Sequence, residues 1–114
     1  MKPILSAFIC LKGTELSKAE AELLQKYNPA GLTLFKRNID TPEQVKKLTN
    51  DIRSAVGRDD FLIAIDQEGG LVRRLRPPHW HKYVSQQQLG TLPAKKAEEA
   101  IRLHAILIAK QQQY

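Results

Sequence analysis

The stretch that decides the fold runs from Phe61 to Arg76 and reads FLIAIDQEGGLVRRLR. It opens with five apolar residues, a run that is too short for a buried helix and typical of a strand covered on both faces. Asp66 ends this run, and an amide, a second acid and two glycines follow at once. The pattern predicts polar groups at the C-terminal end of a buried strand, where α/β proteins bind their ligands.

The segment from Asp66 to Gly70 has two interpretations. In the first it is a tight turn, and its two acids pair with the nearby arginines for structure alone: Asp66 and Glu68 with Arg73, Arg74 or Arg76. In the second it is a ligand-binding loop, in which Asp66 accepts hydrogen bonds from hydroxyl groups and an arginine donates others. Paired glycines serve either purpose, since they allow a sharp turn or a close approach to a ligand. A motif this short, taken alone, favours the structural interpretation.

Composition narrows the class of protein. The chain has 114 residues, 42% hydrophobic and 26% charged, which predicts one globular domain over 1–114. Its one cysteine, Cys10, excludes a disulfide framework within the chain and suits a reducing compartment. The run from Pro3 to Leu11 is too short to span a membrane, and no cleavage site for a signal peptide follows it. We therefore expect a cytoplasmic protein without a membrane partner.

The net charge of +6 raises the question of a polyanionic partner. The basic residues are scattered over several segments, and no aromatic residues alternate with them as stacking platforms. We therefore interpret the charge as a solvated surface and expect no nucleic-acid partner.

Strands and helices alternate along the chain. Ser17 and Glu20 have capping-box spacing, and Thr41 followed by Pro42 marks a second helix start that Gly57 ends. The order β-α-β-α-β-loop-α predicts an α/β fold with parallel strands and right-handed crossovers. Two architectures fit, a small open three-stranded sheet or the first part of a (β/α)8 TIM barrel. The expected strands are 4–11, 31–35 and 61–65, and the expected helices begin after Ser17, after Thr41 and at Ala94.

Four pieces of the chain, in order and spacing, resemble one family. They are K-G-T-E-L after the first strand, G-L-T-L-F-K-R-N from Gly31, the T-P-E-Q helix start at Thr41, and I-A-I-D-Q-E-G-G from Ile63. The chain resembles the N-terminal part of the family 3 glycoside hydrolases, specifically the bacterial cytoplasmic β-N-acetylglucosaminidases of peptidoglycan recycling. The resemblance covers about 4–76 clearly and the last helix by position only.

The resemblance implies a (β/α)8 barrel with the sugar at the C-terminal mouth of its strands. It also implies that the Asp of D-Q-E-G-G and the Arg eight residues later contact hydroxyls of a terminal N-acetylglucosamine, which places these roles on Asp66 and Arg74. Neither residue is a catalyst, and no cofactor is implied. This chain departs from the family at Leu71, where an arginine is usual, and at Arg73, which replaces a neutral polar residue.

The larger departure is an absence. The family's nucleophile is an aspartate late in the barrel, and its acid/base is a histidine in a K-H-F-P-G-H-G loop; these 114 residues contain neither segment. A complete barrel takes about 250 residues. We therefore expect an N-terminal portion of a hydrolase that is inactive alone and binds N-acetylglucosamine saccharides weakly if at all. The alternative is a non-catalytic remnant or interaction module that assembles with a second chain, or with itself through open strand edges.

The histidines and the tryptophan give weaker evidence of a function. His79 and His81 have H-x-H spacing, but without further ligands such a pair is more often incidental, and we predict no metal site. Trp80 between them fits a structural aromatic in a proline-containing loop better than a sugar-stacking platform. His104 is expected in the middle of the last helix as a packing residue.

Overall fold

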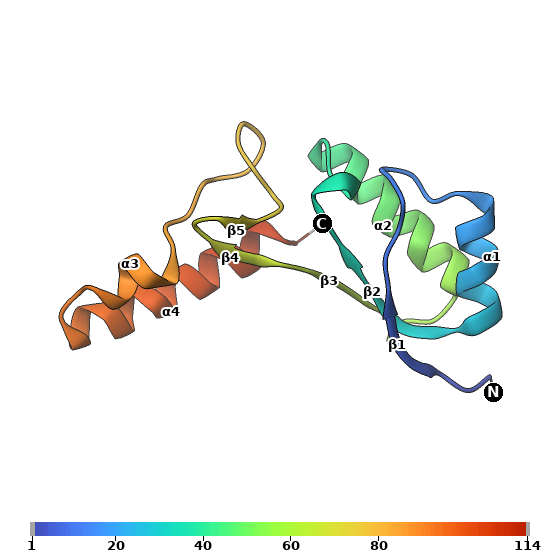
Figure 1. Cartoon of the computed structure of the whole chain (residues 1–114), viewed down its shortest axis with the longest axis horizontal. Coiled ribbons are helices and arrows are strands. Elements are labelled where there is room, and N and C mark those ends of the chain that lie inside the picture. Colours follow the sequence, from blue (N-terminus) through green and yellow to red (C-terminus); the bar gives the residue numbers. More distant parts are fainter. Residues whose placement is uncertain (1, 114) are drawn as a thin grey trace. The chain divides into compact units, whose positions relative to one another are not determined.

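A computed structural model describes residues 2–113 of the chain and divides into two compact units, Met1–Ile65 and Asp66–Tyr114. Figure 1 shows the order of their helices and strands. The first unit holds β1 (Leu5–Ile9), α1 (Lys18–Tyr27), β2 (Pro29–Leu34), the 3₁₀ turn η1 (Lys36–Asn38), α2 (Pro42–Val56) and β3 (Leu62–Ile65). The second holds β4 (Gln67–Gly69), β5 (Val72–Arg73), α3 (Gln86–Gly90) and α4 (Ala94–Gln111).

The three strands of the first unit form a parallel sheet in the order β1-β2-β3. The register pairs Phe8 with Gly31 and Leu34 with Ile65, so the C-terminal ends of the strands lie at one edge of the sheet. This arrangement confirms the predicted α/β class and its β-α-β-α-β order. An antiparallel pairing of the first two strands would have contradicted it.

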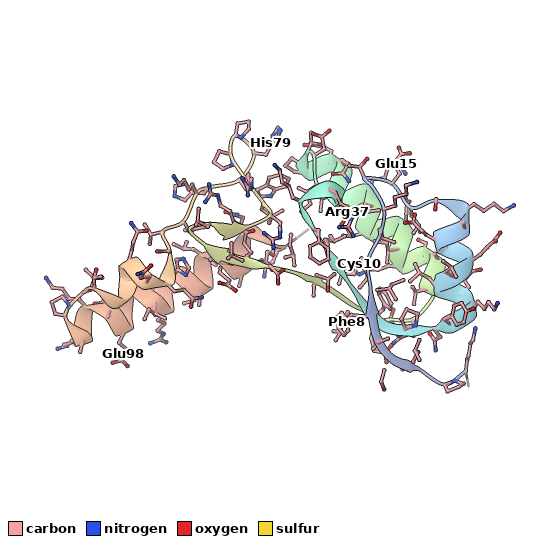
Figure 2. The ribbon with its side chains drawn as sticks, in the orientation of Figure 1. Phe8, Cys10, Glu15, Arg37, His79 and Glu98 are labelled. Atoms are coloured by element: carbon pink, nitrogen blue, oxygen red, sulfur yellow. The ribbon has the colours of Figure 1, made fainter. Side chains whose placement is uncertain are left out.

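Both helices of the first unit cover the same face of the sheet (Figure 1). Leu24 of α1 and Ile52 of α2 pack with Leu32 and Leu34 of β2 in one fully buried cluster. The other face is uncovered: Phe8 and Leu62 are among the large hydrophobic residues that stay exposed, and Figure 2 shows Phe8 on the side of β1 away from the helices. Parallel sheets are normally covered on both faces, so this face is built to be covered.

The N-terminus of α1 is a complete capping box. The Ser17 hydroxyl accepts from the N–H of Glu20, while the Glu20 carboxylate accepts from the N–H groups of Ser17 at 2.9 Å and of Lys12 at 2.8 Å. Burial raises the pKa of Glu20, but these hydrogen bonds and the nearby Lys12 charge outweigh it, and the pKa is held below its ordinary value of 4.5. The carboxylate thereby links α1 to the loop after β1.

This pKa predicts acid sensitivity. A group whose pKa is lowered on folding stabilises the folded state above its unfolded pKa, and this contribution is lost as the pH falls through the folded pKa. Glu20→Gln should therefore lose less stability than the wild type between about pH 5 and pH 2. Urea denaturation followed by circular dichroism at a series of pH values measures this, with exposed Glu22→Gln on the same helix as the matched control. Identical pH profiles for Glu20→Gln and the wild type would contradict the assignment.

The loop after β1 is also held from η1. Asn38 is fully buried, and its amide donates to the carbonyls of Leu11 at 3.1 Å and Gly13 at 2.8 Å, while its carbonyl oxygen accepts from the N–H of Phe35 at 2.8 Å. Arg37 reaches the same loop, where its Nε donates to the carbonyl of Leu11 at 2.9 Å (Figure 2). The K-R-N sequence after β2 thus fixes the loop that follows the C-terminal end of β1.

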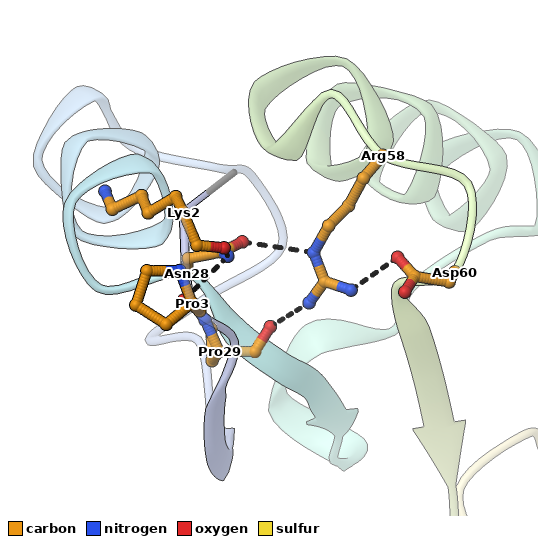
Figure 3. Close-up of polar contacts among 6 residues, drawn as sticks. All are labelled: Lys2, Pro3, Asn28, Pro29, Arg58 and Asp60. Carbon is orange, nitrogen blue, oxygen red and sulfur yellow. Dashed lines mark hydrogen bonds and ion pairs between the residues drawn. The ribbon is translucent and has the colours of Figure 1, made fainter.

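At the opposite edge of the sheet, Arg58 joins the segments that precede the strands (Figure 3). Its Nε donates to the side-chain oxygen of Asn28 at 3.1 Å, Nη2 donates to the carbonyl of Pro29, and Nη1 pairs with Asp60 at 2.5 Å. The amide of Asn28 in turn donates to the carbonyl of Pro3 at 3.0 Å. In α/β barrels this N-terminal edge serves stability rather than chemistry.

The second unit adds elements that the sequence did not predict. Gln67–Gly69 and Val72–Arg73 pair as a short antiparallel hairpin, and Gln86–Gly90 forms a helical turn capped by Ser85. The predicted last helix is confirmed as Ala94–Gln111. None of the helices within the described residues is long and apolar enough to cross a membrane.

Candidate functional site

The polar segment Asp66 to Arg74 forms a folded hairpin. Asp66 follows β3 directly, and β4 leads into a turn at Gly69 and Gly70, whose φ angles are 89° and 60°. Residues with a side chain rarely adopt such angles, so this turn requires its glycines. The chain then returns along β5 and brings Arg74 back to the start of the hairpin.

The two glycines also allow close packing against the segment that follows the loop. A Cβ atom on Gly69 would lie 2.2 Å from the carbonyl oxygen of Val84 and 2.9 Å from Nε2 of His104. A Cβ on Gly70 would lie 2.6 Å from the Cβ of Ser85, and the Gly70 N–H donates to the carbonyl of Tyr83 at 3.0 Å. Of the two purposes predicted for these glycines, a sharp turn or a close approach to a ligand, the structure shows the turn. It adds close packing against Val84 and Ser85.

Gln67 holds the hairpin together, a role that sequence analysis missed. Its side-chain oxygen accepts from the backbone N–H groups of Arg74 at 2.8 Å and Leu75 at 3.0 Å, and its amide donates to the carbonyl of Leu75 at 3.1 Å. Gln67 is only 9% exposed, so all three bonds are made in a protected environment. The buried amide therefore fixes the backbone from which the Arg74 side chain extends. The available signal was the amide placed between two acids at a strand end.

Asp66 and Arg74 are brought together as the sequence predicted. Nη2 of Arg74 lies 3.4 Å from Oδ2 of Asp66, with side chains 23% and 50% exposed respectively. Both keep unused capacity, because the carboxylate has further lone pairs and the guanidinium has five N–H donors. A half-exposed acceptor beside a donor fork suits a ligand with neighbouring hydroxyl groups.

The other charges of the segment do not join this pair. Of the pairings that the structural interpretation allows between the two acids and the three arginines, Arg74 with Asp66 is the one ion pair formed among the described residues. Arg73 is the last residue of β5, and Arg74 follows it in a bend. Arg76 instead donates to the carbonyl of Arg73 at 3.3 Å. Leu71, at the family's arginine position, is 91% exposed.

The histidines of the proline-containing loop contact different rings. His79 lies edge-on to Trp80 with centroids 5.8 Å apart, whereas His81 lies against Tyr83 at 4.9 Å. Between residues 2 and 113 no group of three or more His, Cys, Asp or Glu side chains is arranged to hold a metal ion. Trp80 is buried, so little of its ring is offered to a ligand. His104 packs against Tyr83, and its Nε2 lies 3.0 Å from the carbonyl of Val84.

Comparison with known proteins gives a consistent result. No family model matches the chain. The β-hexosaminidase of Xanthomonas campestris pv. campestris is 42% identical over 106 residues, which cover 90% of this chain and 31% of that protein. The β-hexosaminidase of Haemophilus influenzae is 46% identical over 71 residues, covering 62% of this chain and 20% of that protein.

Solved structures agree. NagZ from Neisseria gonorrhoeae in complex with N-trifluoroacetyl-D-glucosamine matches with a TM-score of 0.86 and 27% identity, over 94% of this chain and 32% of that one. A glycoside hydrolase family 3 β-N-acetylglucosaminidase from Paenibacillus sp. matches with a TM-score of 0.71 and 31% identity, over 82% of this chain and 18% of that one. The chain is homologous to the N-terminal part of the family 3 glycoside hydrolases. It spans about a third or less of the length of these family 3 relatives.

Proposed function

We propose that residues 1–114 act as one segment, which supplies the first strands and a sugar-contacting pair to a cytoplasmic family 3 hydrolase. The proposed reaction releases terminal β-N-acetylglucosamine from saccharides derived from peptidoglycan. The observation that carries the proposal is the ion pair between Arg74 and the half-exposed Asp66, which directly follows β3. Relatives named β-hexosaminidase, and a NagZ structure with a bound glucosamine derivative, support it.

In this proposal the pair binds and orients the sugar. The Asp66 carboxylate accepts hydrogen bonds from two neighbouring hydroxyls, while Arg74 donates to another and keeps the carboxylate in place. Gln67 is a positioning residue, since it fixes the Arg74 backbone. Holding a sugar in one orientation lowers the barrier to its reaction, because less freedom is lost on the way to the transition state.

The bond-breaking groups have to come from elsewhere. A retaining glycosidase needs two groups on opposite sides of the scissile bond, and a carboxylate pair in that role is about 5 Å apart with the sugar between its members. Asp66 and Glu68 lie two residues apart, at the end of β3 and in β4, and have no such arrangement. By the family resemblance, the nucleophile and the acid/base belong to the later part of the barrel.

One observation favours a second candidate, a non-catalytic module that assembles with another chain. Large apolar side chains are exposed on the sheet of the first unit and, separately, along α4 of the second. On the sheet Phe8 is 48% and Leu62 is 58% exposed, and on α4 Leu103 is 54% and Leu107 is 47% exposed. Exposed apolar side chains that lie together on one face are typical of an interaction site. A chain carrying the remaining barrel strands, or a second copy pairing through open strand edges, is the partner we propose.

The isolated 114-residue chain tests both candidates. We expect no hydrolysis of a chromogenic N-acetyl-β-glucosaminide and no N-acetylglucosamine binding tighter than millimolar. Each charge-assisted hydrogen bond contributes about 1.5–3 kcal/mol, and association costs about 4 kcal/mol or more. Calorimetry and a turnover assay measure these quantities. Micromolar affinity or turnover that Asp66→Ala abolishes would contradict the expected inactivity. Activity restored by adding the later part of a relative's barrel would favour the first candidate, whereas assembly with that part without any activity would favour the second.

A further inference from the structure

A concave site lies on the second unit and is distinct from the pair of Asp66 and Arg74. It has a volume of about 540 Å³, within the size range of small-molecule sites. The turn of the β4–β5 hairpin forms one wall, and the segment that begins α3 forms another. The lining side chains that carry the argument are Glu68, Arg73, Lys82, Gln86 and Gln87.

The charged groups of this site form no ion pair within the described part of the chain. Arg73, Lys82 and Glu68 take part in none of the ion pairs formed among residues 2–113. The Nε of Arg73 is buried and has no hydrogen-bond partner within the described residues. A buried donor without a partner is energetically unfavourable. Arg73 and Lys82 thus line the site as two cations, and the Glu68 carboxylate lines it with them.

We propose that this site binds an amino acid or a short peptide as a zwitterion. Its carboxylate is held by Arg73 and Lys82, and its ammonium group by Glu68. A guanidinium fork matches the geometry of a carboxylate, and a second cation adds to the attraction. The side-chain amides of Gln86 and Gln87 offer both donors and acceptors to the peptide group of the ligand. This inference does not depend on the hydrolase proposal.

The same observations disfavour other ligands. Glu68 repels a phosphate dianion, while Arg73 and Lys82 repel a metal ion or a simple amine. Among residues 2–113 no aromatic side chain lines the site, so the described part of the chain offers a sugar ring no platform on which to stack. Only a ligand with charges of both signs satisfies all three ionised groups.

A titration of the isotope-labelled 114-residue chain by NMR tests the proposal. With alanyl-glutamine at neutral pH, the backbone amides of 69–71 and 85–88 should shift in a saturable way. Arg73→Gln, Lys82→Gln and amidation of the peptide carboxylate should each weaken binding about tenfold. Glu68→Gln and N-acetylation of the peptide should do the same. Amidated peptide should bind Arg73→Gln no more weakly than it binds the wild type, because both changes remove one interaction.

The control is Arg102→Gln, which removes an exposed arginine of α4 outside the site and should leave the affinity unchanged. Three results would overturn the proposal. They are the absence of saturable shifts at these amides, equal affinity in Lys82→Gln and the wild type, and inorganic phosphate binding as tightly as the dipeptide. The last of these would indicate general attraction of anions to a basic chain.

Discussion

Gly31→Ala is expected to destabilise the first unit by about 3 kcal/mol. A Cβ at this position would lie 2.4 Å from the carbonyl oxygen of Leu62 and 2.7 Å from the Phe8 ring. The first obstacle is the backbone of the neighbouring strand, which cannot move without breaking the register between β2 and β3. Strain of this size is a large part of the total stability of about 5–15 kcal/mol of a small domain.

Gly13→Ala is the matched control, since nothing lies within 4 Å of a Cβ at that position. Its free energy of unfolding should stay within about 0.5 kcal/mol of the wild type. Urea denaturation followed by far-ultraviolet circular dichroism measures both variants. Equal stability of the two would show that β2 and β3 are not packed as closely as the structure has them.

The regular elements were predictable because local chemistry and packing agree there. Ser17 and Thr41 cap their helices through their hydroxyls, and Gly57 ends α2 in a left-handed conformation. The alternation of apolar strands and amphipathic helices specified the parallel sheet. The observed strand bounds differ from the predicted ones by a residue or more. For example, β1 ends at Ile9 rather than at Leu11.

The hairpin and α3 were not predictable by the same means. β4 and β5 have three and two residues, too few for a periodic pattern, and they are held by the side chain of Gln67. The short helix α3 does carry a signal, since Ser85 and Gln88 form a capping box. The helix was not predicted because the polar run Q-Q-Q follows the cap, and no apolar stripe accompanies it.

The candidate site was predictable in part. The strand followed by D-Q-E-G-G placed Asp66 at a strand end, and the resemblance added Arg74, which the structure brings within 3.4 Å. The role of Gln67 depends on three hydrogen bonds to residues seven and eight positions away, which no short motif records. No contact among the described residues explains why this chain has Leu71 where the family usually has an arginine.

The second large effect is expected in a chimera. The matching segment of the Xanthomonas campestris pv. campestris β-hexosaminidase, 42% identical over 106 residues, would be replaced by this chain. The later part of the barrel then supplies the groups that break the bond. Asp66→Asn keeps the shape of the side chain but removes the charge that accepts from two hydroxyls. Losing about 3 kcal/mol of transition-state binding corresponds to about a hundredfold lower kcat/KM.

The most direct test of the proposed sugar-binding role is kcat/KM of this chimera with a chromogenic N-acetyl-β-glucosaminide. The proposal predicts activity in the chimera, a loss of about a hundredfold in Asp66→Asn, and no change in Asp59→Asn, which alters an exposed acid before β3. A folded chimera that is inactive, or one that keeps full activity with Asp66→Asn, would contradict it.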